Sequence, residues 1–121
     1  MAKIIVIDDE PYILLMLKKM LEMEGHSVEM AKNGKDGLAM INTNPPDLVI
    51  TDIVMPEKEG LETIREVRKK YPGMKIIAIS GGGRLDSNEY LEPARHFGAA
   101  RIIKKPFQKS EMVNAVKDLL V

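Results

Sequence analysis

Short apolar runs that end on polar residues constrain the fold of this chain more than any other feature of its sequence. Each run is too short for a helix and is rich in apolar, mostly β-branched residues, which predicts a buried parallel strand. The runs and the residues that end them are Lys3–Ile7 with Asp8 and Asp9, Leu48–Thr51 with Asp52, Lys75–Ile79 with Ser80, and Arg101–Ile103 with Lys104, Lys105 and Pro106. In open α/β sheets, ligands bind just beyond the carboxyl ends of the strands. The sequence therefore predicts that carboxylates, a hydroxyl and an ammonium converge on one edge of a sheet.

The segments between these runs have the patterns of amphipathic helices and of one further strand. Pro11 suits a first helical turn, apolar residues then recur at three- and four-residue spacing, and Gly25 suits a helix end. Ser27–Ala31 alternates like a strand, and Asn33-Gly34 is typical of a turn. The other expected helices end near Asn42, follow Gly60, lie within Ser87–Phe97 around Pro93, and start with Ser110 as a cap.

This alternation of strands and helices predicts a parallel sheet that is covered by helices on both faces. We expect an α/β fold: a flavodoxin-like, doubly wound (βα)5 sheet with strand order 2-1-3-4-5. Residues 1–121 would form a single domain with no output domain. That strand order places the first and third strands side by side at the switch point of the sheet. Asp8, Asp9 and Asp52 are then expected to be neighbours.

Composition argues against several classes of protein. The chain has 18 Lys and Arg residues and 18 Asp and Glu residues, whereas nucleic-acid-binding modules usually have a basic excess. Aromatic residues make up only 4%, too few for a platform that stacks bases, and the lack of cysteine excludes disulfides and thiolate metal sites. The sequence opens without a signal-peptide pattern and has no apolar run as long as a membrane span. We therefore expect a soluble, cytoplasmic protein that binds neither nucleic acid nor membrane directly.

The polar residues at the strand ends suit phosphoryl chemistry. Neighbouring carboxylates repel one another, and Mg²⁺, which favours carboxylate, carbonyl and phosphate oxygens, would relieve that repulsion. Asp52 would then stay ionised and could act as a nucleophile toward phosphorus, because carboxylates form covalent phosphoryl intermediates. The Lys105 ammonium would neutralise charge on the transferring group, and Ser80 could donate a hydrogen bond to a phosphoryl oxygen.

These residues, in this order, resemble the receiver domain of two-component response regulators (CheY-like proteins), and the resemblance extends from Lys3 to about Leu120. The motifs are Asp8-Asp9-Glu10, Thr51-Asp52-Ile53-Val54-Met55-Pro56 with Gly60, Ile79-Ser80, and Lys105-Pro106-Phe107. The resemblance implies that Asp52 accepts a phosphoryl group from a phosphohistidine on a sensor histidine kinase or a histidine phosphotransfer protein. It also implies that phosphorylation changes the face formed by the fourth helix, fifth strand and fifth helix, which an output partner protein would bind.

The resemblance also assigns roles around the phosphorylated residue. Asp9, Asp52 and the backbone carbonyl of Val54 would ligate Mg²⁺, and Asp8 would act through water. Ser80 matches the family's switch hydroxyl, and Lys105 matches its lysine. Such a domain is not an enzyme in the ordinary sense, because it catalyses only its own phosphorylation and dephosphorylation.

The sequence departs from the family's pattern at the expected output face. Ile102 stands three residues before the lysine, where the family often has an aromatic residue that reports phosphorylation. The run Gly81-Gly82-Gly83 is unusual, and Pro93 falls within the expected fourth helix, where it would remove a hydrogen bond. These departures bear on switching at the output face and not on the predicted phosphorylation site.

Other interpretations of the same residues stay open. Taken alone, Asp8 and Asp9 could cap the first helix, Asp52 could form a turn, and Lys104-Lys105 could be a solvated pair. An aspartate-nucleophile phosphatase of the haloacid-dehalogenase kind is a second functional hypothesis, although such enzymes typically have an Asp where this chain has Val54. The third is a pseudo-receiver that docks partners without phosphorylation. The sequence disfavours a flavin carrier, because no hydroxyl-rich phosphate loop follows the first strand.

Overall fold

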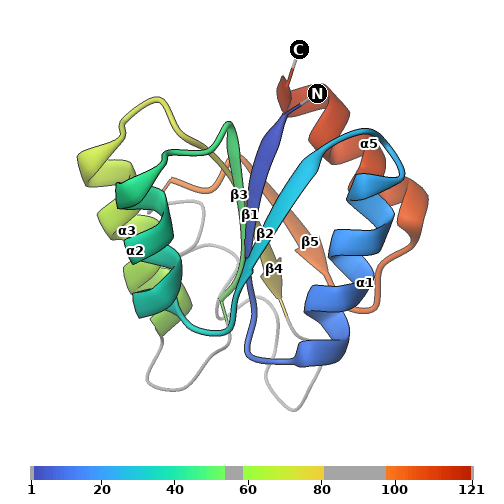
Figure 1. The fold of residues 1–121 in the computed structure, drawn as a ribbon, viewed down its shortest axis with the longest axis horizontal. Coiled ribbons are helices and arrows are strands. Elements are labelled where there is room, and N and C mark those ends of the chain that lie inside the picture. Colours follow the sequence, from blue (N-terminus) through green and yellow to red (C-terminus); the bar gives the residue numbers. More distant parts are fainter. Residues whose placement is uncertain (1, 54–58, 81–97, 121) are drawn as a thin grey trace.

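The fold is a five-stranded parallel sheet between two layers of helices (Figure 1). The computed structural model describes residues 2–53, 59–80 and 98–120. The strands are β1 (Lys3–Ile7), β2 (Ser27–Ala31), β3 (Leu48–Asp52), β4 (Lys75–Ser80) and β5 (Arg101–Lys104). The helices are α1 (Pro11–Glu22), α2 (Gly34–Thr43), α3 (Glu59–Lys70) and α5 (Lys109–Leu120). The sheet order is β2-β1-β3-β4-β5, which confirms the predicted fold class and strand order.

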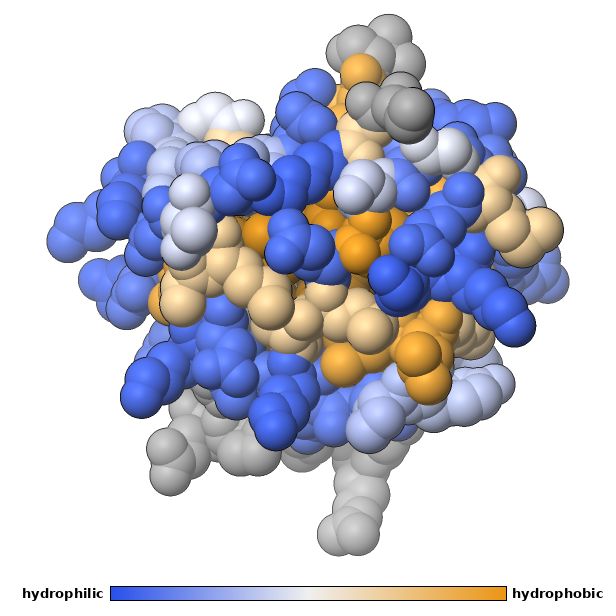
Figure 2. Space-filling model, viewed as in Figure 1, coloured by the Kyte–Doolittle hydropathy of each residue, from blue (hydrophilic) through white to orange (hydrophobic). Residues whose placement is uncertain are grey.

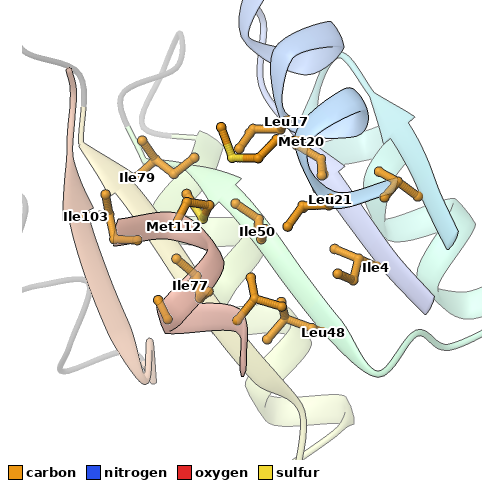
Figure 3. Packing of buried hydrophobic residues seen from close by; sticks show 14 of the residues in the cluster. Ile4, Leu17, Met20, Leu21, Leu48, Ile50, Ile77, Ile79, Ile103 and Met112 are labelled. Atoms are coloured by element: carbon orange, nitrogen blue, oxygen red, sulfur yellow. The ribbon is translucent and has the colours of Figure 1, made fainter. Parts of the chain in front are cut away.

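Two apolar cores fill the space between the sheet and the helices. Because successive strand residues point to opposite faces, Ile4 and Val6 pack with α1 and α5, whereas Ile5 and Ile7 pack with α2 and α3. Figure 3 shows the first core, in which side chains of β3 and β4 meet Leu17 and its neighbours on α1. Both faces of the sheet are therefore buried, as expected of parallel strands.

The outer surfaces of the helices are mainly polar. Figure 2 shows one face of the molecule on which hydrophilic residues dominate, with a band of apolar and intermediate residues across its middle. Large apolar side chains that are nevertheless exposed include Tyr12, Leu15 and Met23, all in or just after α1. Within residues 2–53, 59–80 and 98–120, no helix combines the length and apolarity needed to cross a membrane.

Two helix starts differ from the sequence-based expectation. The Asn33 side chain accepts a hydrogen bond from the Asp36 amide at 2.7 Å, so Asn33-Gly34 begins α2 rather than forming a separate turn. The prediction that Ser110 caps the last helix is wrong, because α5 already begins at Lys109. The backbone carbonyl of Gln108 accepts the first hydrogen bonds of that helix, which leaves Ser110 inside its first turn.

Three strands extend one residue further than the apolar pattern predicts, and their polar last residues share one edge of the sheet. Asp52 ends β3 and pairs in register with Ile79 of β4, and Ser80 ends β4 and pairs with Lys104 of β5. Strand pairing uses backbone groups, so a polar side chain does not stop it. The helix expected within 87–97, together with Pro93 and Gly81-Gly82-Gly83, lies outside the described residues.

Candidate functional site

Asp8 is a fully buried carboxylate directly after β1. Its side chain has no solvent exposure, and its backbone amide donates a hydrogen bond to the Ala31 carbonyl of the neighbouring strand. The carboxylate oxygen Oδ1 accepts a hydrogen bond from the Glu10 amide at 2.9 Å. The residue that caps α1 is Glu10, whose side chain makes no capping hydrogen bond. Asp8 therefore does not cap the helix, and its second carboxylate oxygen faces another partner.

Asp52 lies beside Asp8 because β1 and β3 are adjacent. The register pairs Ile7 with Thr51, so the residues that follow, Asp8 and Asp52, reach the same edge of the sheet. Asp52 is only 2% exposed and belongs to the strand rather than to a turn. Gly60 of α3 packs against the backbone at this point, since a Cβ at Gly60 would overlap the Asp52 carbonyl oxygen.

Lys105 joins the two buried carboxylates. It follows β5, its side chain is 10% exposed, and its Nζ lies 2.9 Å from Oδ2 of Asp8 and 3.1 Å from Oδ2 of Asp52. A third carboxylate oxygen, Oε1 of Glu10, lies 3.4 Å from the same nitrogen. The neighbouring Lys104 is exposed, so the two lysines are not the solvated pair that the sequence alone also allowed.

Burial and ion pairing oppose each other at this site. Burial raises the pKa of Asp8, and the hydrogen bond from the Glu10 amide and the Lys105 ammonium counteract only part of that rise. Burial acts to lower the pKa of Lys105, but the carboxylates of Asp8 and Asp52 outweigh it and raise that pKa. Lys105 is therefore held in its charged form by the two acids that it contacts.

The acidic residues form a group with the chemistry of a metal site. Asp8, Asp9, Glu10 and Asp52 each offer a carboxylate oxygen, and these oxygens all lie within 4.8 Å of one another. Asp8 and Asp52 are buried, whereas Asp9 and Glu10 are exposed. The expected proximity of Asp8, Asp9 and Asp52 is thus present. Glu10 was not among the predicted site residues, although its place directly after Asp8-Asp9 was the available signal.

Three further predictions concern residues around this group. Ser80 is the last residue of β4, so its backbone lies at the same edge of the sheet, and its role as a switch hydroxyl stays a prediction. The backbone carbonyl of Val54, predicted as a metal ligand, lies outside the described residues. Ile102 is half-buried and packs against the core beneath α2 and α3.

Comparison with known proteins agrees with this fold and identifies the family of the chain. Residues 4–117 match the sequence model of the response regulator receiver domain. The chain belongs to the response regulator receiver domain family. The resemblance drawn from the sequence motifs is thereby confirmed.

Individual relatives of this receiver domain are transcription regulators and solved receiver domains. It is 33% identical to the transcriptional regulatory protein CpxR of Klebsiella pneumoniae over 99% of the chain and 50% of that protein. It is also 33% identical to the transcriptional regulatory protein GlrR of Escherichia coli over 98% of the chain and 26% of that protein. The chain thus spans half or less of the length of these two relatives. A receiver domain protein from Clostridium thermocellum has a crystal structure with a TM-score of 0.89, 34% identity, and coverage of 99% of this chain and 94% of that one.

Proposed function

We propose that this receiver domain accepts a phosphoryl group on Asp52 and changes its partner-binding surface in response. The observation that supports the proposal is the contact of one largely buried ammonium, that of Lys105, with two buried carboxylates, Asp8 and Asp52. A cation held against a nucleophilic carboxylate can neutralise the charge of an arriving phosphoryl group, which is most of what phosphoryl transfer needs from a protein.

The transfer would proceed by in-line displacement at phosphorus. A carboxylate oxygen of Asp52 attacks the phosphorus of a phosphohistidine on a sensor histidine kinase or a phosphotransfer protein. The new O–P bond forms as the P–N bond breaks, and the imidazole leaves with the electron pair and takes up a proton. Lys105 donates a hydrogen bond to a phosphoryl oxygen, and Ser80 is proposed to donate another.

The donor set at this edge fits Mg²⁺. All four members of the acidic group offer carboxylate oxygens, the hard ligands that this cation prefers. Asp9 and Asp52, with the backbone carbonyl of Val54 and with Asp8 through water, would hold the ion. When bound, Mg²⁺ supplies positive charge for the phosphoryl oxygens, in addition to that of Lys105. Asp52 would stay ionised in this setting and so remain a nucleophile.

The consequence of phosphorylation would be a change in protein contacts rather than turnover of a substrate. We propose that an output partner binds a face that includes β5 and α5, and that the domain catalyses only its own phosphorylation and dephosphorylation. A cytoplasmic location fits a phosphohistidine donor of this kind. The same surface would serve an output domain if the chain is part of a longer regulator. The chain spans only 50% of the transcriptional regulatory protein CpxR.

The decisive experiment is intact mass after incubation with acetyl phosphate and Mg²⁺. The parent should gain one phosphoryl group, and Asp52→Asn should gain none while keeping its fold by circular dichroism. Asp118→Asn is the matched control, because Asp118 is an exposed acid that pairs with Arg101 on β5, and it should be phosphorylated like the parent. Equal phosphorylation of Asp52→Asn would overturn the assignment, and sustained hydrolysis of a phosphomonoester would favour the phosphatase instead.

A further inference from the structure

Three carboxylates share the Lys105 ammonium. Its Nζ donates hydrogen bonds to Asp8, Asp52 and Glu10, at 2.9, 3.1 and 3.4 Å. An ammonium has three N–H donors, so these three acceptors occupy all of them. A phosphoryl oxygen on Asp52 can therefore receive a hydrogen bond from Lys105 only if one carboxylate gives up its place.

The three carboxylates differ in how easily they can leave. Asp8 has no solvent exposure and is further fixed by the Glu10 amide, so its release would leave a buried charge without its cation. Asp52 would bear the phosphoryl group, so its side chain stays beside Lys105. The Glu10 side chain is 59% exposed and makes the longest of the three contacts, so its carboxylate can turn into water at little cost.

The backbone of Glu10 keeps its carboxylate near the site even after release. Its amide donates to Asp8, and its carbonyl accepts hydrogen bonds from the Ile13 and Leu14 amides at the start of α1. Both backbone groups of Glu10 are therefore tied to the folded structure. A negative charge tethered there competes for the Lys105 ammonium and repels the anionic group that the ammonium would bind.

We propose that Glu10 is the partner that Lys105 exchanges for a phosphoryl oxygen, and that Glu10 thereby sets the affinity of the site for phosphoryl groups. Glu10 is a positioning residue, because it acts through Lys105. The inference rests on the proposed function and adds a regulator to the same site. Removing the charge of Glu10 should strengthen binding of a phosphoryl mimic by about two- to five-fold, the range expected of an ion pair whose carboxylate is exposed to solvent.

Beryllofluoride binding at saturating Mg²⁺ tests the exchange directly. Beryllofluoride is titrated into the parent and into the Glu10→Gln variant, and the Kd of each protein for beryllofluoride is measured from amide NMR shifts. Glu10→Gln should bind about two- to five-fold more tightly, and the gain should shrink with added NaCl, because salt screens exposed charges. Glu10→Asp keeps the charge but withdraws it by one methylene, so its gain should be smaller. A structural role for Glu10 would not produce a salt-dependent gain in affinity.

Glu22→Gln is the matched control. Glu22, the last residue of α1, is likewise an acid that pairs with a lysine, Lys18 at 3.0 Å. Its substitution changes the net charge equally without changing the site. Its Kd should equal that of the parent. Unchanged or weaker binding by Glu10→Gln, with binding by the parent intact, would overturn the exchange and leave the proposed function standing. If the parent does not bind beryllofluoride, or if Asp52→Asn binds it equally well, both the exchange at Glu10 and the proposed function are overturned.

Discussion

Gly60, in the first turn of α3, packs directly against the backbone of Asp52. A Cβ at Gly60 would overlap the Asp52 carbonyl oxygen and lie 2.5 Å from the Cα of Ile53. Both atoms belong to the main chain, so neither can move aside as the end of a flexible side chain could. The absence of a side chain at Gly60 therefore lets α3 start against the end of β3, where the proposed phosphoacceptor lies.

Gly60→Ala should destabilise the fold and disturb the site together. The added methyl group must push α3 away from β3, and overpacking of this kind usually costs about 1–3 kcal/mol. We expect a loss of that size in the free energy of unfolding in urea, and slower phosphorylation by acetyl phosphate. Gly73→Ala is the control, because a Cβ at Gly73 would meet nothing within 4 Å. Equal stability of the two variants would show that the contact with Asp52 is unimportant.

Lys105→Met should destabilise the protein when Mg²⁺ is absent. The substitution keeps most of the aliphatic volume but leaves Asp8 and Asp52 buried without their shared cation. Such a change costs about 3 kcal/mol, the lower end of the range for a buried pair, because Lys105 keeps some solvent exposure. Urea unfolding without Mg²⁺ should show the loss. Added Mg²⁺ should restore much of it, because the carboxylates that would bind the ion remain. We expect Mg²⁺ affinity to be retained while phosphorylation is weakened.

Two comparisons make the Lys105 prediction specific. Lys104→Met changes an exposed neighbour and should have the stability of the parent. Asp8→Asn should be much less harmful in the Lys105→Met background than its effect alone would suggest, because one of the two unpaired charges is gone. If the losses of Asp8→Asn and Lys105→Met simply add, the two residues are not coupled and the site has been misinterpreted.

The sequence determined the architecture because the relevant signals are periodic and local. Apolar runs of strand length alternate with helical patterns, and that alternation leaves few topologies once crossovers are right-handed. The strand order then brings Asp8 and Asp52 together, although 44 positions separate them in the sequence. Lys105 joins them because β5 ends at the same edge of the sheet.

What the sequence did not reveal depends on contacts of single atoms. Apolar periodicity could not show that Asn33 bonds the Asp36 amide, or that α5 starts one residue before Ser110. The proposed role of Glu10 could not be predicted for the same reason. A glutamate at a helix start is common, and only its distance from Lys105 distinguishes this one. Side-chain geometry of this kind is set by tertiary packing rather than by local pattern.

The buried Asp8 carboxylate should make stability depend on pH. Burial raises the pKa of Asp8 above its ordinary value of 3.8, so the folded protein keeps this proton where the unfolded chain releases it. Its contribution to the free energy of unfolding is therefore greatest below pH 3.8 and falls as pH rises through the raised pKa. The pKa of Lys105 is raised above 10.5, so its contribution is present below pH 10.5 and is lost as pH rises through that raised value.

Asp8→Asn isolates the acid part of this dependence. The free energy of unfolding of the parent minus that of Asp8→Asn should decrease as pH rises from about 3.8 toward neutrality. Urea unfolding of both proteins at a series of pH values, without Mg²⁺, measures the difference and cancels the groups that they share. A difference that grows with pH would mean that pairing with Lys105 outweighs burial, and that the pKa of Asp8 is lowered.

The Asn33 cap should contribute measurably to stability without affecting the site. Its Oδ1 accepts a hydrogen bond from the Asp36 amide, and removing such a cap typically costs about 1 kcal/mol. We expect Asn33→Ala to lose about that much in urea unfolding, and Asn33→Ser to recover most of it, since serine also caps helices well. Asn114→Ala, at an exposed position inside α5, should not be destabilising, because alanine has the higher helix propensity. Phosphorylation at Asp52 should be unchanged in all three variants, and a stability equal to that of the parent in Asn33→Ala would contradict the cap.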